Sequence, residues 1–164
     1  MRITPCTTAL AGQAESLIRT VFPSMSPFER MSLVAIMHPL GLSGRMVMFL
    51  GQIKGVIAFD VMVDDFDRVL GTTGLYSLRR GSDVAAWVAW FCVDPAARGQ
   101  GIGQALLDHT VALGRAAALR KLRLYTSTDP NEVAAQVLYE KNGFAEVARK
   151  RGLFTTTIYR ERSL

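Results

Sequence analysis

The sequence has few of the cysteines and histidines that build disulfide scaffolds and metal sites, and it lacks an apolar run long enough for a membrane span. Its two cysteines, Cys6 and Cys92, match no metal-ligand or redox spacing, and it contains only two histidines. The longest apolar run, residues 84–93, stops at Asp94, well short of the roughly 20 residues of a membrane-spanning helix. The first residues lack the continuous apolar stretch of a secretion signal. We therefore expect a reduced, cytoplasmic protein that has no contact with a membrane.

Length and composition are typical of one globular domain. Because domains average roughly 150 residues, the 164 residues predict a single domain over residues 1–164. A hydrophobic fraction of 49% with 20% charged residues is typical of a chain with a packed core and excludes a disordered one. Nineteen Lys and Arg against fourteen Asp and Glu give a net charge of +5. This excess favours an anionic partner, and nucleic acid, a phosphate-bearing cofactor and an acidic substrate all remain open.

Hydrophobic periodicity and turn residues divide the chain into helices and strands. Helices are expected at residues 8–22, between Ser26-Pro27 and His38-Pro39, at 102–119 and at 132–141. Strands are expected at residues 56–63, 69–77, 84–93, 122–126, 144–148 and 154–160. Residues 41–55 include an apolar run that fits either a helix or a strand. Because strands precede, separate and follow the helices, the pattern predicts an α+β fold with helices packed on a mixed sheet.

The most informative segment is a glycine-rich loop, residues 93–103, between an expected buried strand and an expected long helix. Gly99, Gly101 and Gly103 allow a tight turn and a close approach of the backbone to a ligand. The first N–H groups of the helix have no intrahelical partner, and with the helix dipole and Arg98 they suit a phosphate. On the glycines alone, a tight turn that binds nothing remains an equal alternative.

The spacing of this loop excludes the two commonest nucleotide motifs. A dinucleotide fingerprint would need a third glycine where the chain has Gln104, counted from Gly99, or Leu106, counted from Gly101. A Walker loop needs Gly-Lys-Ser/Thr, whereas Gly103 is followed by Gln104. The loop is therefore neither a dinucleotide fingerprint nor a Walker loop.

The remaining pattern, Arg-Gly-Gln-Gly-Ile-Gly at residues 98–103, resembles the pyrophosphate loop of the GNAT superfamily of acyl-CoA-dependent N-acyltransferases. A second segment, LYEKNGF at residues 138–144, is similar to the LYEKxGF stretch that follows the next strand in that family. The runs at residues 90–95 and 71–76 also resemble family segments. Four matching segments in the family's order cover the chain from about residue 56 to its end.

This resemblance implies the GNAT fold, a mixed and mostly antiparallel sheet of six to seven strands flanked by about four helices, and acetyl-CoA as co-substrate. It implies that the strand at 84–93 splays from that at 122–126, with the pantetheine arm in the opening and the diphosphate on residues 98–103. The implied cofactor-binding residues are Phe91, Cys92, Val93, Arg98, Gly99, Gln100, Gly101, Ile102, Gly103, Gln104 and Asn131. Family members often have Asn seven residues before the helix tyrosine; that position is Glu132 here, and Asn131 precedes it.

Acetyl transfer to an amine poses two proton problems, and the resemblance assigns a residue to one of them. A substrate amine with a pKa near 10.4 is only about one part in 10³ neutral at pH 7, so it must lose a proton before it attacks a thioester. The departing thiolate must gain one. Tyr139 is the expected general acid, because the family has a tyrosine here on the cofactor side and a phenol of pKa about 10 suits a thiolate.

No residue stands out as the general base. Glu29 and Asp60 are candidates, although each is more often a solvated surface carboxylate. His38, at a helix end, and His109, on an apolar helical face, are expected to be structural. Cys92 in a buried strand is expected to be an inert thiol, so direct transfer without an acyl-enzyme is predicted.

The sequence thus predicts an N-acetyltransferase that acts on a primary amine of a small molecule or peptide. The alternatives are a non-catalytic acyl-CoA-binding regulatory protein and a family member that uses a longer acyl-CoA. A nucleic-acid-binding module is disfavoured because the basic residues are scattered. Family members often dimerise, so a homodimer is a further expectation.

Overall fold

The computed structural model describes residues 1–25, 27–37, 46, 48–79, 84–153 and 155–164. The strands are β1 (Arg2–Pro5), β2 (Ile53–Val63), β3 (Val69–Leu78), β4 (Ala85–Val93), β5 (Lys121–Ser127), β6 (Ala145–Arg151) and β7 (Thr156–Ser163). The helices are α1 (Thr8–Val21), α2 (Pro27–Met37), α4 (Ile102–Ala116) and α5 (Val133–Lys141), with 3-10 turns at Pro95–Ala97 and Pro130–Glu132.

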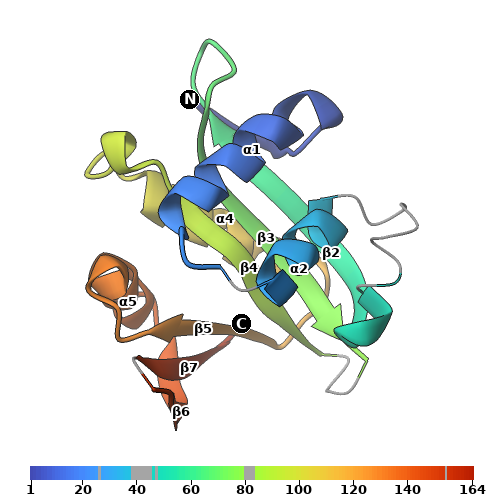
Figure 1. The fold of residues 1–164 in the computed structure, drawn as a ribbon, viewed down its shortest axis with the longest axis vertical. Helices are drawn as coiled ribbons and strands as arrows, with labels where there is room; N and C mark the ends of the chain where they lie inside the picture. The colour runs from blue at the N-terminus through green and yellow to red at the C-terminus, as the bar shows by residue number, and fades with distance from the viewer. Residues whose placement is uncertain (26, 38–45, 47, 80–83, 154) are drawn as a thin grey trace.

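All seven strands form one sheet in the order β1-β2-β3-β4-β5-β7-β6 (Figure 1). β4 and β5 pair in parallel, and every other neighbouring pair of these strands is antiparallel. The long α4 supplies the crossover that a parallel connection requires. The expected mixed, mostly antiparallel α+β architecture is confirmed.

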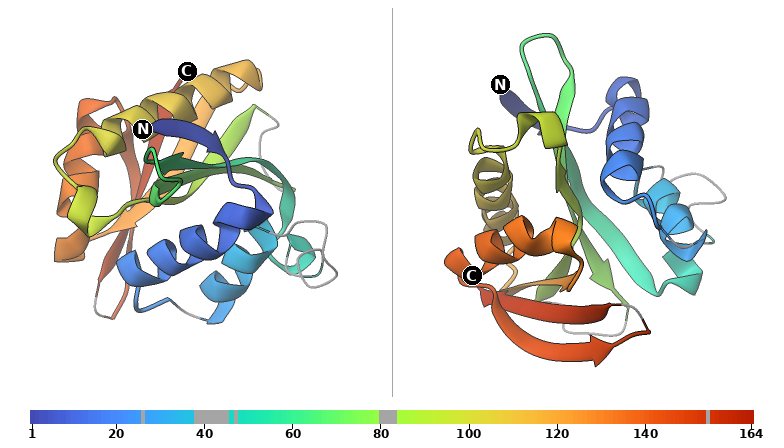
Figure 2. Two further views of the ribbon diagram at one scale, coloured as in Figure 1. Left: turned by 90° about the horizontal axis from the view of Figure 1, so that it is seen from above. Right: turned by 60° about the vertical axis from the view of Figure 1, so that its left-hand side comes forward.

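Helices cover both faces of this sheet (Figure 2). On one face, α1 and α2 bury apolar side chains against β2, β3 and β4, in a cluster that includes Ile18, Leu33, Val61 and Cys92. On the other face, α4 and α5 pack on β3, β4 and β5 in a cluster that includes Leu75, Leu107, Leu122 and Tyr139. Since alternate residues of a strand point to opposite faces, these two clusters fix the face to which each side chain of β5 belongs. In β4 the alternation is interrupted, because Val88 belongs to the cluster under α4 and α5 and Cys92 to the cluster under α1 and α2.

Several element boundaries differ from the sequence expectations, among them the end of β6, which was expected at residue 148 and lies at Arg151. β1 was not expected; it is four residues long and pairs with a strand more than fifty residues away. α4 ends at Ala116, before residue 119, because Ala118 turns into the left-handed region with φ of +54° and the N–H of Leu119 bonds the carbonyl of Gly114. β7 runs from Thr156 to Ser163, a few residues beyond the expected range.

Some of the expectations concern residues outside the described ranges. These are the Ser26 start and the His38-Pro39 end of the second helix, residues 41–45 and 47, the connection at 80–83, and position 154. In the stretch left open between helix and strand, Met46 and residues 48–50 are helical, and β2 begins at Ile53. Among the described helices, none is both long and apolar enough to cross a membrane.

Candidate functional site

The parallel strands β4 and β5 separate soon after they meet. Their pairing covers only residues 85–87 of β4 against residues 121–123 of β5. Trp90 adopts φ of +48°, and the register of β3 against β4 shifts between Thr72 and Gly74, which marks a β-bulge in β4. Figure 1 shows β4 and β5 running apart from this point. The opening between residues 88–93 of β4 and residues 124–127 of β5, hereafter the splay, leaves the β5-facing backbone groups of β4 without ladder partners in this described region.

Phe91, Cys92 and Val93 line the β4 side of the splay. The Phe91 ring contacts the Tyr139 ring at a centroid distance of 5.7 Å. Cys92 points to the opposite face, where its buried Sγ lies 3.2 Å from the hydroxyl of Thr72, and burial raises the pKa of its thiol to about 12. A protonated, enclosed thiol is a poor nucleophile, in agreement with the structural role expected for Cys92.

The glycine loop leads from the end of β4 into α4. Asp94 accepts a hydrogen bond from the N–H of Ala96 and a second from Arg68, and these contacts hold the pKa of its carboxyl below the usual range. Gly99 and Gly101 both have φ of +78°, a conformation that costs an L-residue with a Cβ roughly 1–2 kcal/mol. The backbone conformation at these two positions therefore favours glycine over any other residue.

The N-terminus of α4 has the features of an anion site. Gly101 occupies the N-cap position, no side chain caps the helix, and its first turn contains no acidic residue. Arg98 is exposed beside it and makes no hydrogen bond or ion pair with the described part of the chain. The first N–H groups of the helix, its positive dipole end and a free guanidinium thus converge at the open end of the splay.

The remaining loop residues hold α4 in place. Ile102 is buried with Leu106 under β2 and β3. A Cβ on Gly103 would lie 3.4 Å from Leu138 of α5, which explains the close approach of the two helices. Gln104 donates to Asp108 and exchanges hydrogen bonds with the side chain of Asn142. Gln100 is exposed at the tip of the loop.

Tyr139 lies on α5 between two aromatic rings. Its side chain is only 6% exposed, and its ring contacts Phe144 as well as Phe91. Its hydroxyl has no hydrogen-bond partner among the described residues. Burial, followed by the charge of Glu132, raises the pKa of this phenol above its ordinary value. The hydroxyl is thus protonated and makes no hydrogen bond to the described residues.

Glu132 is the residue that the sequence reasoning missed. Its carboxylate accepts hydrogen bonds from the hydroxyl of Thr126 and from both the N–H and the hydroxyl of Ser127, at 3.0 and 2.6 Å. These hydrogen bonds hold the Glu132 carboxylate at the end of β5. The charge of Glu132 also raises the pKa of Tyr125 and that of Tyr139. Asn131, expected to contact cofactor, is exposed on the same 3-10 turn, and its N–H bonds Asp129. The sequence does contain a signal for this residue, because Glu132 stands at the position where the family pattern has Asn.

The two candidate bases lie on different faces of the sheet. Asp60 is buried on the α4 face, where its Oδ2 lies 2.6 Å from Nε2 of His109. It ties β2 to α4 and is not brought to the splay, so His109 has the structural role that was expected. Glu29 lies in the first turn of α2, close enough to Tyr125 of β5 to raise the pKa of that phenol.

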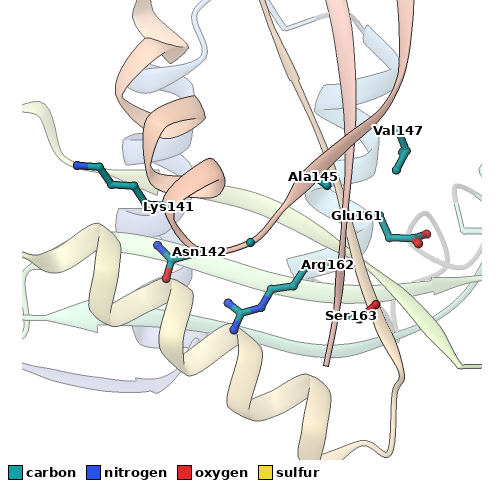
Figure 3. Close-up of a pocket in the computed structure, with 8 residues that line it drawn as sticks. Lys141, Asn142, Ala145, Val147, Glu161, Arg162 and Ser163 are labelled. Carbon is teal, nitrogen blue, oxygen red and sulfur yellow. The ribbon is translucent and has the colours of Figure 1, made fainter.

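A surface hollow of about 650 Å³ lies at the end of α5, beside β6 and β7 (Figure 3). It is lined by Lys141, Asn142, Gly143, Ala145, Val147, Glu161, Arg162 and Ser163. None of the predicted site residues lines it, so it is separate from the splay. No group of three or more His, Cys, Asp or Glu side chains in the described ranges could hold a metal ion.

Comparison with known proteins agrees with this geometry. The family model for the acetyltransferase (GNAT) domain matches residues 56–146. An acetyltransferase of the GNAT family from Staphylococcus aureus superposes with a TM-score of 0.76 and 20% identity, over 99% of this chain and 98% of that one. A ribosomal-protein-alanine N-acetyltransferase from Brucella melitensis superposes with a TM-score of 0.71 and 16% identity, over 100% of both chains. No curated protein matches the sequence.

Proposed function

Because the chain belongs to the GNAT acetyltransferase family, an enzyme family of acyltransferases, we propose that it moves an acetyl group from acetyl-CoA directly to a primary amine of a small molecule or peptide. The observation that carries the proposal is the junction of the splay with the uncapped start of α4. Along the splay, backbone groups of β4 lack hydrogen-bond partners in the β4–β5 ladder, and the first N–H groups of α4 lack a side-chain cap. One extended, anionic thioester ligand satisfies both.

The residues of the loop fit the diphosphate of such a ligand. The absence of acidic side chains from the first turn of α4 leaves the positive end of the helix dipole uncompensated. Apart from the adjacent residues, no atom of the described part of the chain lies within 4 Å of where a Cβ on Gly99 or Gly101 would be, so the loop backbone is open to close approach. Arg98 would add a charge-assisted hydrogen bond. Phe91, Cys92 and Val93 would bind the pantetheine arm through their backbone groups.

The reaction forms a C–N bond and breaks the C–S bond of the thioester. The ammonium group of the acceptor must lose one proton before attack and the nitrogen loses a second afterwards, while the thiolate leaves with the C–S electron pair and takes up one proton. One proton is released overall. Tyr139 is proposed to donate the proton to the thiolate, because a phenol is protonated at neutral pH and no hydrogen bond to the described residues occupies this hydroxyl.

Direct transfer is favoured over an acyl-enzyme. Cys92 is the cysteine of the splay strand, and its thiol is buried with a pKa raised to about 12, so the thiolate fraction at pH 7 is negligible. Incubation with acetyl-CoA alone should leave the intact mass of the protein unchanged. A stable adduct on Cys92 would contradict direct transfer.

A thermal-shift comparison tests the cofactor assignment. A ligand that binds only the folded state raises the melting temperature by mass action. We expect acetyl-CoA and free CoA to stabilise the protein, NAD to leave it unchanged, and Arg98→Ala to reduce the CoA effect. If no CoA species stabilises the protein at saturating concentration, the loop is only a turn and the proposal fails.

A further inference from the structure

Three aromatic side chains form a closed cluster at the vertex of the splay. Trp87, Tyr125 and Tyr159 contact one another pairwise, with ring centroids 6.3 to 6.5 Å apart and interplanar angles of 51° to 85°. We call these three residues the aromatic trio. They come from three different strands, β4, β5 and β7, and Tyr125 pairs directly with Tyr159 across the β5–β7 ladder.

The trio lies on the face of the sheet that carries α1 and α2. Ala86, Val88, Leu122 and Leu124 belong to the cluster under α4 and α5, so the residues that alternate with them point to the opposite face. Trp87 is the last residue of β4 that pairs with β5, opposite Arg123. Tyr125 follows two positions later, inside the splay, and is 51% exposed. The proposed acid Tyr139 belongs to the other face, so the trio borders the splay from the side opposite to it.

Negative charge adjoins the trio. The pKa of Tyr125 is raised by burial and then by the charges of Glu29 and Glu132. Three donors occupy the Glu132 carboxylate, which has about four acceptor positions, and no cation of the described chain pairs with it. The neighbouring cations Lys121 and Arg123 are both bonded to Glu161. The Thr126 hydroxyl reaches Glu132 from the face of α4 and α5, and the Ser127 hydroxyl reaches it from the face of the trio. The Glu132 carboxylate therefore lies at the end of β5 between the two faces, two residues beyond Tyr125, and its partners among the described residues are neutral donors.

We propose that the aromatic trio and Glu132 form the acceptor site, and that the acceptor is an aralkylamine, a primary amine carried by a short linker on an aromatic ring. The inference rests on the proposed acetyl transfer and specifies its substrate class. Aromatic faces attract both a flat ring and an ammonium group. The ammonium group would donate a hydrogen bond to the remaining acceptor position of Glu132, which lies within electrostatic reach of both Tyr125 and Tyr139.

Fluorescence of Trp87 measures acceptor binding without requiring turnover. The protein has two tryptophans, so in a Trp90→Phe background the signal reports on the trio alone. The CoA-saturated protein is titrated with 2-phenylethylamine, with butylamine, which lacks the ring, with 2-phenylethanol, which lacks the charge, and with spermidine. We expect 2-phenylethylamine to bind at least about tenfold more tightly than each of the others, a factor that corresponds to about 1.4 kcal/mol. Equal or tighter binding of butylamine or spermidine would overturn the proposal.

Matched variants separate recognition from folding. Tyr125→Leu and Glu132→Gln should each weaken 2-phenylethylamine binding several-fold while the CoA-induced thermal shift stays unchanged. Phe66→Leu, the same kind of change at a 92% exposed side chain in the β2–β3 turn, is the control and should change neither value. Unchanged amine binding in Tyr125→Leu would show that the trio only packs the strands together.

The readouts also distinguish the two proposals. If CoA fails to stabilise the protein, the proposed function falls, whatever the amine titration shows. If CoA binds and 2-phenylethylamine shows no preference, the proposed function stands and the acceptor class is wrong. If both bind and no thiol is released, acetyl transfer falls and the acceptor assignment falls with it, because an amine that takes up no acetyl group is not an acceptor.

Discussion

The Tyr139 hydroxyl can bond a ligand because it is protonated and makes no hydrogen bond to the described residues of the protein. Tyr139→Phe should therefore fold as the wild type does and keep its response to CoA. Its kcat should fall by about 10²- to 10⁴-fold, the usual contribution of a positioned general acid. Steady-state thiol release together with the melting temperature measures both effects. An unchanged kcat where chemistry limits the rate would remove Tyr139 from the mechanism.

Buried Cys92 predicts a loss of stability in alkali. Its pKa is about 12 in the folded state against 9.0 as the reference value, so the folded protein holds this proton more tightly than the unfolded chain. The resulting stability is fully present below pH 9 and is lost as pH rises toward 12, by at most about 1.4 kcal/mol per pH unit. Urea unfolding at pH 8 and at pH 10 should show a smaller decline in Cys92→Ala than in the wild type. Parallel declines would contradict this assignment.

Among single residues, the sequence assigned roles to those that belong to contiguous motifs, and these roles stay predictions. Arg98 and Tyr139 stand in local patterns that can be read without the fold. The aromatic trio could not be predicted, since Trp87, Tyr125 and Tyr159 meet only through the β4–β5 and β5–β7 registers. The role of Asp60 was ambiguous for the same reason. Its place in a strand is visible in the sequence, but its contact with His109 on α4 is not.

The start of α4 depends on a backbone conformation that glycine alone adopts without strain. Gly101→Ala should destabilise the protein by roughly 1–2 kcal/mol, although no atom blocks the new Cβ, and it should weaken CoA binding. The matched control is Gly12→Ala in the interior of α1, where φ is ordinary and space is open. The same chemical change should there stabilise the protein by about 0.5–1 kcal/mol. Thermal unfolding of the two variants should shift in opposite directions, and equal shifts would contradict the account.

Helices and strands were predictable where periodicity or turn chemistry is strong. α1, α5 and the β2–β4 meander follow their patterns closely. The short β1 carries too few residues for a pattern and is specified by its pairing with β2. The end of α4 was placed too late because Ala118, and not a glycine, takes the left-handed position after the helix. The β-bulge at Trp90, which helps to open the splay, has no sequence signal of this kind.

The whole molecule carries a net charge of +5, and Arg98 is the cation that is proposed to bind the cofactor. CoA binding should therefore weaken as salt rises, because the Debye length falls from about 10 Å at 0.1 M to about 3 Å at 1 M. In Arg98→Ala the Kd for CoA should rise about tenfold and depend less on salt. Calorimetric titration at the two salt concentrations tests this. An Arg98→Ala variant with the salt dependence of the wild type would place the diphosphate elsewhere.

The central claim is acetyl transfer from a thioester bound in the splay to an amine. The most direct measurement follows thiol release from acetyl-CoA with 2-phenylethylamine and identifies the organic product by mass spectrometry. The account predicts free CoA and N-acetylated amine in equal amounts, at a rate that rises with pH as the amine loses its proton and that falls in Tyr139→Phe. Two results would contradict acetyl transfer. One is thiol release without an acetylated amine, and the other is no thiol release with any primary amine although CoA is bound.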